Sequence, residues 1–437
     1  MNYKLLVILF IIVLLTLPQC SSTKDNTITD NYKPDTITQI NSAAKSYKIK
    51  GSITLDDIIS YFVTHNPELK SLQAKINAAD SSIRQSGLLP NPSLHAGVDQ
   101  IPTNNLKVNE GRRSIGVAEP IELGGKRASR IQFAKEQKNI ATLDYEARLS
   151  ELILEAKNVF NNVLLAQSEL LLTRERLDFE IKLLDIIQKS YVAGRLTQAE
   201  FLNSEQKLAQ ARISLQGKEE TLKNELHNLR KLLSIDESTP LECSTKLEPL
   251  FYGVKPDKIK ETMLANHPRI KLRQSSIKLT EAQLAEDRAG RIPDLKVGLD
   301  YMEPGQGIPN MLGLNIELPL PIFNQNQGKI AQTQSELIAA QEQLQAVEND
   351  LITAFNQAVN NYQLAADNMT LYESKIMPNE EKQYKIVEES YKFGRISHQE
   401  ALTARIKLID TTLAYLRLIK VLNDASAELE YLAGKPQ

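Results

Sequence analysis

The feature that most constrains this chain of 437 residues is an internal duplication with a period of about 200 residues. Its clearest copies, Ser190–Glu200 and Ser390–Glu400, share a Ser-Tyr-x-x-Gly-Arg pattern followed by an aliphatic and a hydroxyl residue. Two further matches, at an offset of 201 residues, join Asn66–Lys70 to His267–Lys271 and Leu94–Asp99 to Leu295–Asp300. Solenoid units repeat every 20–50 residues or so. The longer period therefore predicts a duplicated domain or one pseudo-symmetric fold.

Each repeat predicts the same order of elements: a helix, two strands, a very long helix and a shorter returning helix. The first helices, about 67–87 and 268–289, stop before prolines. Apolar and polar residues then alternate, which is typical of strands with one apolar face. The predicted strands, paired as two hairpins, are about 93–100 and 114–123 in the first repeat and about 294–302 and 311–320 in the second.

The long helices are the largest predicted elements. Between Arg127 and Tyr191 there is no Pro or Gly, and apolar residues recur at spacings of three and four in both repeats, which indicates a coiled-coil seam. At 1.5 Å per residue, about 65 residues span roughly 100 Å. Each long helix is expected to end at Gly194 or Gly394 and to return as about 197–233 or 397–432. By themselves, such seams favour a structural coiled coil.

Composition excludes several classes of protein. The 52 basic and 54 acidic residues leave a net charge of −2, so there is no basic face of the kind that nucleic acids require. Two cysteines cannot build a disulfide framework, and Cys243, between the repeats, is predicted to be a free thiol. No phosphate-binding loop or nucleophile elbow occurs. The prediction is a protein that is not an enzyme and has neither cofactor nor metal site, because the five histidines lack metal-ligand spacing: His65, His95, His227, His267 and His398.

The N-terminus predicts export from the cytoplasm. Lys4 precedes an apolar run, Leu5–Leu17, that is too short to span a bilayer and suits a signal peptide of residues 1–19. Leu17-Pro-Gln-Cys20 resembles a lipoprotein signal, which predicts lipidation of Cys20; the alternative is ordinary cleavage nearby, with Cys20 incidental. Residues 20–53 are predicted to form an extended tether. No later segment is long and apolar enough to be a membrane-spanning helix.

Four strands cannot close a membrane barrel, because the smallest such barrels have about eight. An open sheet in lipid would leave the polar groups of its edge strands unpaired. The strands therefore belong either to a soluble sheet or to a barrel shared by several chains, with eight strands for two chains and twelve for three.

Two sets of motifs resemble the TolC-type outer-membrane efflux factor family over about residues 53–433. These are the turns 191–197 and 391–397 and the strand-to-helix segments 120–127 and 320–328, and the latter are most similar to the heavy-metal (cobalt-zinc-cadmium or copper-silver) cation branch.

The resemblance implies a mainly α fold with a small β part. Three chains would form a homotrimeric 12-stranded outer-membrane β-barrel, continued by a periplasmic α-helical barrel, in a diderm bacterium. Each chain would consist of a first structural repeat, 54–253, and a second, 254–437.

The implied function is that of a passive exit duct. It would sit in outer-membrane lipid and work with a periplasmic adaptor and an inner-membrane transporter of the resistance-nodulation-division type. The alternative is a periplasmic coiled-coil structural or adaptor protein without channel activity.

The resemblance also places the two turns at the periplasmic tip, where the adaptor docks. Thr197 with Glu200, and Ser397 with Glu400, have the spacing of helix capping boxes, so the same motif could be only a turn optimised twice. Asp185, Glu388 and Glu389 are candidate gate charges. The candidate adaptor contacts are Tyr191, Gly194, Arg195, Leu196, Thr197, Tyr391, Gly394, Arg395, Ile396 and Ser397.

Overall fold

The computed structural model describes residues 51–101, 111–243, 245–251, 253, 256–303 and 309–434. All of them belong to the unit Ile49–Gln437. The predicted signal peptide, Cys20 and the tether up to residue 50 lie outside the described residues.

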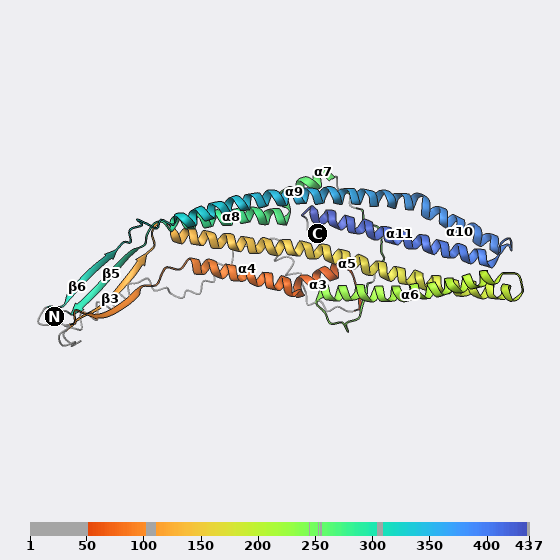
Figure 1. The fold of residues 1–437 in the computed structure, drawn as a ribbon, viewed down its shortest axis with the longest axis horizontal. Helices are drawn as coiled ribbons and strands as arrows, with labels where there is room; N and C mark the ends of the chain where they lie inside the picture. Colours follow the sequence, from red (N-terminus) through yellow and green to blue (C-terminus); the bar gives the residue numbers. More distant parts are fainter. Residues whose placement is uncertain are drawn as a thin grey trace. The chain divides into compact units, whose positions relative to one another are not determined.

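The two repeats contain the same elements in the same order (Figure 1). The first repeat comprises α3 (Leu55–His65), α4 (Pro67–Ser86), β2 (Ser93–Asp99), β3 (Arg112–Ile121), α5 (Lys126–Val192) and α6 (Gln198–Leu233). The second comprises α7 (Pro256–Asn266), α8 (Pro268–Ala289), β5 (Leu295–Glu303), β6 (Met311–Glu317), α9 (Gln327–Leu371), η2 (Tyr372–Ile376), α10 (Met377–Lys392) and α11 (His398–Leu432). The mainly helical, duplicated fold expected from the sequence is confirmed.

The long helices of the two repeats differ in one respect. In the first repeat α5 is unbroken over 67 residues. In the second, the π-helical turn η2 separates α9 from α10, and the expectation of one unbroken helix up to Gly394 is wrong there. Pro378 follows this turn and cannot donate a backbone hydrogen bond. A π turn rearranges the hydrogen bonds just before such a residue without ending the helix.

The strands end earlier than the sequence pattern suggested. β3 stops at Ile121 rather than about 123, because the backbone N–H of Leu123 donates to the Asp294 carboxylate at 3.3 Å instead of to a strand. β6 stops at Glu317 rather than about 320, because Pro319 and Pro321 have no N–H to offer a ladder.

Four short elements were not predicted. β1 (Gly51–Ile53) pairs in parallel with β4 (Leu241–Cys243), so the expected tether is wrong at residues 51–53. The helices α3 and α7 precede α4 and α8, and a Thr54–Asp57 capping box starts α3. Cys243 is a buried free thiol, and burial raises its pKa to about 12, so the thiol stays protonated and unreactive.

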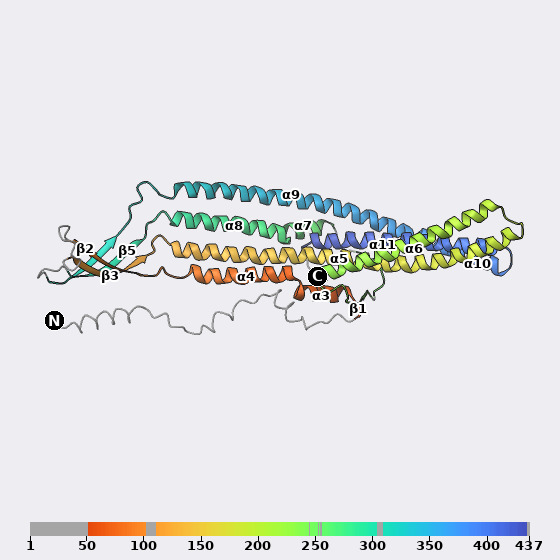
Figure 2. The ribbon, with the colours of Figure 1, turned by 60° about the horizontal axis from the view of Figure 1, so that its bottom comes forward.

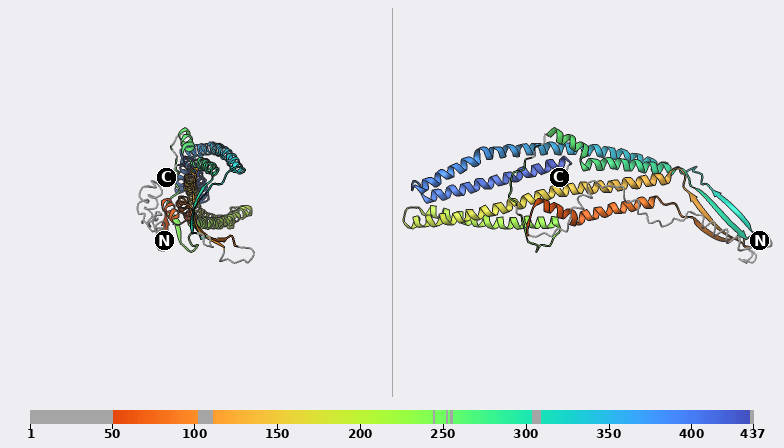
Figure 3. Two further views of the ribbon diagram at one scale, coloured as in Figure 1. Left: turned by 90° about the vertical axis from the view of Figure 1, so that its left-hand side faces the viewer. Right: turned by 180° about the vertical axis from the view of Figure 1, so that it is seen from behind.

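The four long strands form one antiparallel sheet at one end of the helices (Figures 1 and 3). Its order is β2-β3-β5-β6, so the two hairpins meet through β3 and β5, and β2 and β6 are edges in this chain. Figure 2 shows α5 between α4 and α8. Helix α5 contacts α4, α6, α8 and α11 and carries much of the buried core. Among the described residues, no helix combines the length and apolar character needed to cross a membrane.

Candidate functional sites: the amphipathic sheet and the helical tips

One face of the four-stranded sheet is apolar and exposed. Strand pairing aligns Leu94, Val117, Leu299 and Leu314 in a row across the four strands. Leu94 is 69% exposed and Leu314 is 64% exposed, which is unusual for large apolar side chains that have a core to enter. Further exposed apolar residues on this face are Val98, Ile115, Ile121, Leu312 and Ile316. A continuous exposed apolar surface of this kind marks an interaction or membrane surface.

The opposite face of the sheet is polar. Asp99 and Arg112 form a bidentate ion pair across β2 and β3, with both N–O distances 2.8 Å. Lys296 pairs with Glu317 across β5 and β6 at 3.2 Å. Alternating apolar and polar positions therefore give the sheet two chemically distinct faces.

A histidine and an aspartate meet in the middle of the polar face. His95 on β2 and Asp300 on β5 lie on strands separated by β3, and their Nε2 and Oδ1 atoms are 2.5 Å apart. Asn315 on β6 donates to the other oxygen of Asp300. The pair can form because Gly116 lies between them in register; a methyl group at Gly116 would collide with both side chains.

Sequence reasoning set His95 aside because its spacing to other histidines is not that of metal ligands. Its partner, Asp300, is 205 residues away, and only the register of both hairpins brings them together. The signal in the sequence was that both fall on polar positions of predicted strands. Among the described residues there is no group of three or more His, Cys, Asp or Glu side chains arranged to hold a metal ion.

The helical tips lie at the other end of the long helices, and their turns are nearly identical. Gly194 and Gly394 have φ values of 71° and 69°, in the left-handed region that favours glycine. In each turn the next residue, Arg195 or Arg395, donates its backbone N–H to the serine carbonyl five residues earlier at 2.9 Å. The predicted reversal at these glycines is confirmed.

The predicted capping boxes are also present. The Thr197 hydroxyl accepts from the backbone N–H of Glu200, and the backbone N–H of Thr197 donates to the Glu200 carboxylate. Ser397 and Glu400 form the same two hydrogen bonds. These hydrogen bonds lower the pKa of both glutamates. The capping boxes therefore fix where α6 and α11 begin.

The side chains around the two turns differ between the repeats. Tyr191 stacks on Phe201 with 5.2 Å between ring centroids, and Leu196 packs on a small core formed by α5 and α11. In the second turn Phe393 is 75% exposed, and the Arg395 guanidinium lies 5.7 Å from its ring centroid. Tyr391 is exposed, Ile396 is half-buried, and the second turn thus offers the larger exposed aromatic surface.

The candidate gate charges lie close to the tips, and two of the three pair within their own helices. Asp185 binds Lys189 at 2.6 Å, and Glu388 binds Lys392 at 3.3 Å. Glu389 is exposed. The structure therefore brings none of the three into an ion pair between helices within the described part of this chain.

Ion pairs between helices occur instead along α5 and α11, and sequence reasoning missed them. Arg176 binds Asp410 at 2.6 Å. Glu169, with a side chain only 5% exposed, binds Arg417 of α11 at 2.6 Å and Lys218 of α6 at 2.5 Å. One buried carboxylate thus connects both repeats.

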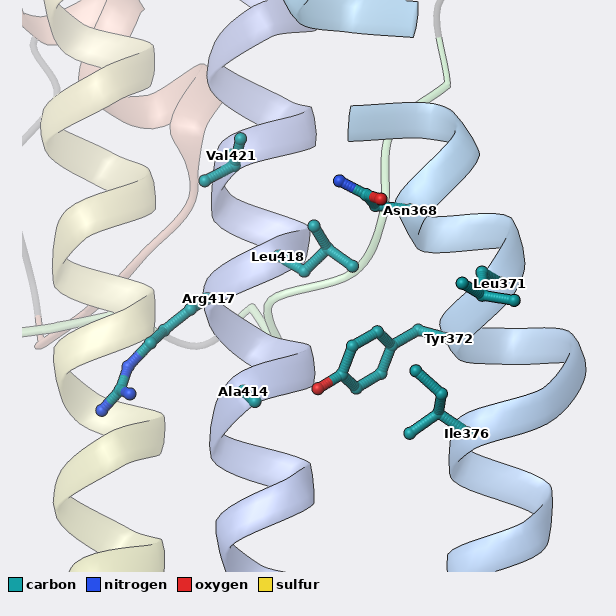
Figure 4. Close-up of a pocket in the computed structure, with 8 residues that line it drawn as sticks. All are labelled: Asn368, Leu371, Tyr372, Ile376, Ala414, Arg417, Leu418 and Val421. Atoms are coloured by element: carbon teal, nitrogen blue, oxygen red, sulfur yellow. The ribbon is translucent and has the colours of Figure 1, made fainter. Parts of the chain in front are cut away.

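The π turn borders a groove of about 360 Å³ between η2 and α11 (Figure 4). Tyr415 donates its hydroxyl to Glu373 at 2.9 Å and stacks on Tyr372. The groove is mainly apolar and is lined by Asn368, Leu371, Tyr372, Ile376, Ala414, Arg417, Leu418 and Val421.

The chain has the fold of solved outer-membrane channels. A structure of CusC, from work on folding and transmembrane channel formation, has a TM-score of 0.70 at 16% identity and covers 90% of this chain and 96% of that one. The Campylobacter jejuni CmeC outer membrane channel has a TM-score of 0.69 at 16% identity and covers 89% of this chain and 90% of that one.

The chain belongs to the outer membrane efflux protein family, whose sequence model matches residues 59–234 and 260–435. The TolC-type resemblance drawn from the turn and strand-to-helix motifs is thereby confirmed. A similar curated protein is the cobalt-zinc-cadmium resistance protein CzcC of Cupriavidus metallidurans, which is 24% identical over 287 residues. That match covers 64% of this chain and 66% of CzcC, just under two thirds of the relative. The family is one of efflux proteins rather than enzymes.

Proposed function

We propose that this protein is the outer-membrane exit channel of a tripartite efflux system and that its cargo is divalent metal cations. The observation that carries the proposal is the amphipathic sheet at one end of helices about 100 Å long, given a rise of about 1.5 Å per residue. Its apolar face suits lipid and its polar face suits a water-filled passage.

Assembly of the channel follows from the edges of the sheet. In lipid, the unpaired backbone groups of β2 and β6 would each cost several kcal/mol. Pairing β6 of one subunit with β2 of the next removes every edge. Three copies with four strands each would give twelve strands, the homotrimeric barrel that the family resemblance implies. The predicted lipid anchor at Cys20 would add a second attachment to the outer membrane.

The helical tips are the proposed contact with a periplasmic adaptor. Their exposed surface contains Tyr391, Phe393 and Arg395, and aromatic and arginine side chains are enriched in protein interfaces. The adaptor would connect the channel to an inner-membrane transporter of the resistance-nodulation-division type, which supplies the energy. Asp185, Glu388 and Glu389 remain proposed gate residues, since each lies within a few helical turns of the tip.

Metal cations are the proposed cargo because the curated relative CzcC is described as a cobalt-zinc-cadmium resistance protein. The polar face of the sheet presents Asp99, Asp300 and Glu317, of which Asp99 and Glu317 are paired with Arg112 and Lys296.

The proposal can be tested in cells that lack the gene. We expect these cells to become more sensitive to Zn²⁺, Co²⁺ or Cd²⁺, and expression of the wild-type chain to restore tolerance. The purified protein should also conduct ions in planar bilayers. Unchanged metal tolerance together with increased sensitivity to organic toxins would contradict the metal cargo. Release of the protein from membranes by salt alone, with no conductance, would favour the alternative of a periplasmic coiled-coil protein.

A further inference from the structure

We propose that His95, oriented by Asp300, is a transient ligand for a divalent transition-metal ion on the polar face of the sheet. The inference rests on the proposed function, which makes this face the wall of the passage. It adds a specific binding residue that the family match does not assign.

The proposed site pairs a buried carboxylate with a half-exposed imidazole. The Asp300 side chain is 9% exposed and the His95 side chain is 49% exposed. An ionised carboxylate only accepts hydrogen bonds. His95 must therefore donate from Nε2, the atom that lies 2.5 Å from Asp300 Oδ1. In the neutral imidazole, Nδ1 then carries the free lone pair.

Asp300 is itself held in place. Its second oxygen accepts from the side-chain amide of Asn315, and Gly116 and Gly313 flank it in register on the neighbouring strands. Gly116 leaves the space in which the two side chains meet. The carboxylate is thus a fixed acceptor, and it fixes both the tautomer and the ring orientation of His95.

This arrangement is the one that metal-binding histidines use. A ligating imidazole commonly donates its other ring N–H to a carboxylate, which raises the basicity of the ligating nitrogen. Within the described residues, no group hydrogen-bonds to Nδ1 of His95, and half of its side chain is exposed. Imidazole suits Zn²⁺, Cu²⁺ and Ni²⁺.

One histidine per chain, with water completing the coordination, gives a weak site. No third protein ligand is grouped with His95 and Asp300 in the part of the chain that the structure describes. Weak binding suits a passage, because conduction requires that the ion can leave as well as enter. The site would therefore select the chemical class of the cargo without retaining it.

The test measures histidine modification in the full-length protein purified in detergent. Diethyl pyrocarbonate labels accessible imidazoles, and peptide mass spectrometry gives the labelling rate of each histidine with and without Zn²⁺. We expect Zn²⁺ to slow labelling of His95 several-fold, while labelling of His398 at the tip, which has no carboxylate partner among the described residues, changes little. In Asp300→Asn, the Zn²⁺ concentration for half protection of His95 should rise about tenfold or more.

The second measurement is Zn²⁺ binding by equilibrium dialysis, which compares the wild type with His95→Gln. His398→Gln, a substitution of an exposed histidine at the tip, is the matched control. The site predicts that only His95→Gln loses bound Zn²⁺. Equal protection of His95 and His398 in the wild type would overturn the inference, even if Asp300→Asn failed to fold. Zn²⁺ binding is measured on purified protein, so it is separable from efflux in cells. If cells without the gene lose metal tolerance but Zn²⁺ does not protect His95, the site alone is refuted. If Zn²⁺ protects His95 but those cells keep their metal tolerance, the proposed cargo alone is refuted.

Discussion

The long helices of the two repeats have nearly the same sequence pattern at their tips, yet they occupy different positions in the layer of helices. α5 is unbroken, contacts five other helices (α3, α4, α6, α8 and α11) and buries residues along most of its length. Its counterpart is interrupted by η2, and α10 has no buried residue. The difference shows that duplication preserved the turns while position in the layer determined the packing.

The exposed helix of the second repeat has a direct consequence for assembly. α5 lies inside the layer of helices, whereas α9 and α10 lie at its edge, with α8 and α11 as neighbours. The exposed Ile386 of α10 therefore lies at the edge that a neighbouring subunit would meet in the proposed trimer. Matched substitutions in the two repeats can test this comparison.

The largest expected difference between the repeats is in the pH dependence of stability. It concerns the helix caps Asn66 and His267, which occupy equivalent positions. Burial lowers the pKa of His267 to about 4, below its value of about 6.5 in the unfolded chain. Because the folded pKa is lower, the neutral imidazole of His267 lets the folded chain keep its full stability above about pH 6.5. This stability is lost as the pH falls toward 4, since the unfolded chain then binds the proton more readily. We expect a loss of about 3 kcal/mol between pH 7 and pH 4.

His267→Asn, which copies the first repeat, should remove this part of the pH dependence in urea denaturation followed by circular dichroism. Asn66→His is the reciprocal variant and should introduce a similar dependence if its site is equally buried. An unchanged pH profile in His267→Asn would show that the buried imidazole does not contribute.

The second comparison removes the same side chain from each long helix. Ile187 of α5 is 6% exposed and packs on Leu183 and Leu402, so Ile187→Ala should cost roughly 2–3 kcal/mol. Ile386 of α10 is 55% exposed within this chain, and in the separated subunit Ile386→Ala should cost less than about 0.5 kcal/mol. Equal losses, measured by urea denaturation, would show that another subunit covers α10 as fully as α6 and α11 cover α5.

The third comparison should give equal effects in both repeats. Gly194→Ala and Gly394→Ala place a side chain in the left-handed region, which costs roughly 1 kcal/mol; nothing lies within 4 Å of either added methyl group. Gly217→Ala in the interior of α6 is the control and should stabilise the protein by up to about 1 kcal/mol. Unequal losses at the two tips would contradict the equivalence of the turns.

The smallest effects are expected at the gate candidates. Asp185→Asn and Glu388→Gln each break an exposed pair within one helix, and each should change the free energy of unfolding by less than about 0.5 kcal/mol. If these charges act in gating, channel conductance should change while stability does not. Unaltered conductance in both variants would remove them as gate residues.

The sequence predicted most of the architecture because its signals are local. Gly194 and Gly394, with the Thr197 and Ser397 capping boxes, determine the turns from a few adjacent residues. Alternation placed the four strands to within a few residues. β1 was missed because residues 51–53 form a strand only by pairing with residues 241–243, far along the chain. The π turn was missed because Pro378 alone does not reveal whether a helix ends or adapts.

The candidate sites were predicted less completely for the same reason. Residues of the tip turns are neighbours in sequence, whereas His95 and Asp300 depend on the register of two hairpins. The Glu169 connection to Lys218 and Arg417 depends on three helices. Single residues on a charged helix surface give no indication of which of them will be buried.

The most direct test of the proposed channel is whether β2 and β6 join neighbouring subunits. In a Cys243→Ser background, cysteine is introduced at Leu94 of β2 together with one position of β6, scanned from Leu312 to Ile316, and cells are oxidised before the membranes are analysed. The shared barrel predicts covalent dimers and trimers for the paired register, and none from either single cysteine. Exclusively monomeric chain at every position, with the protein still in the outer membrane, would contradict a barrel closed by several copies.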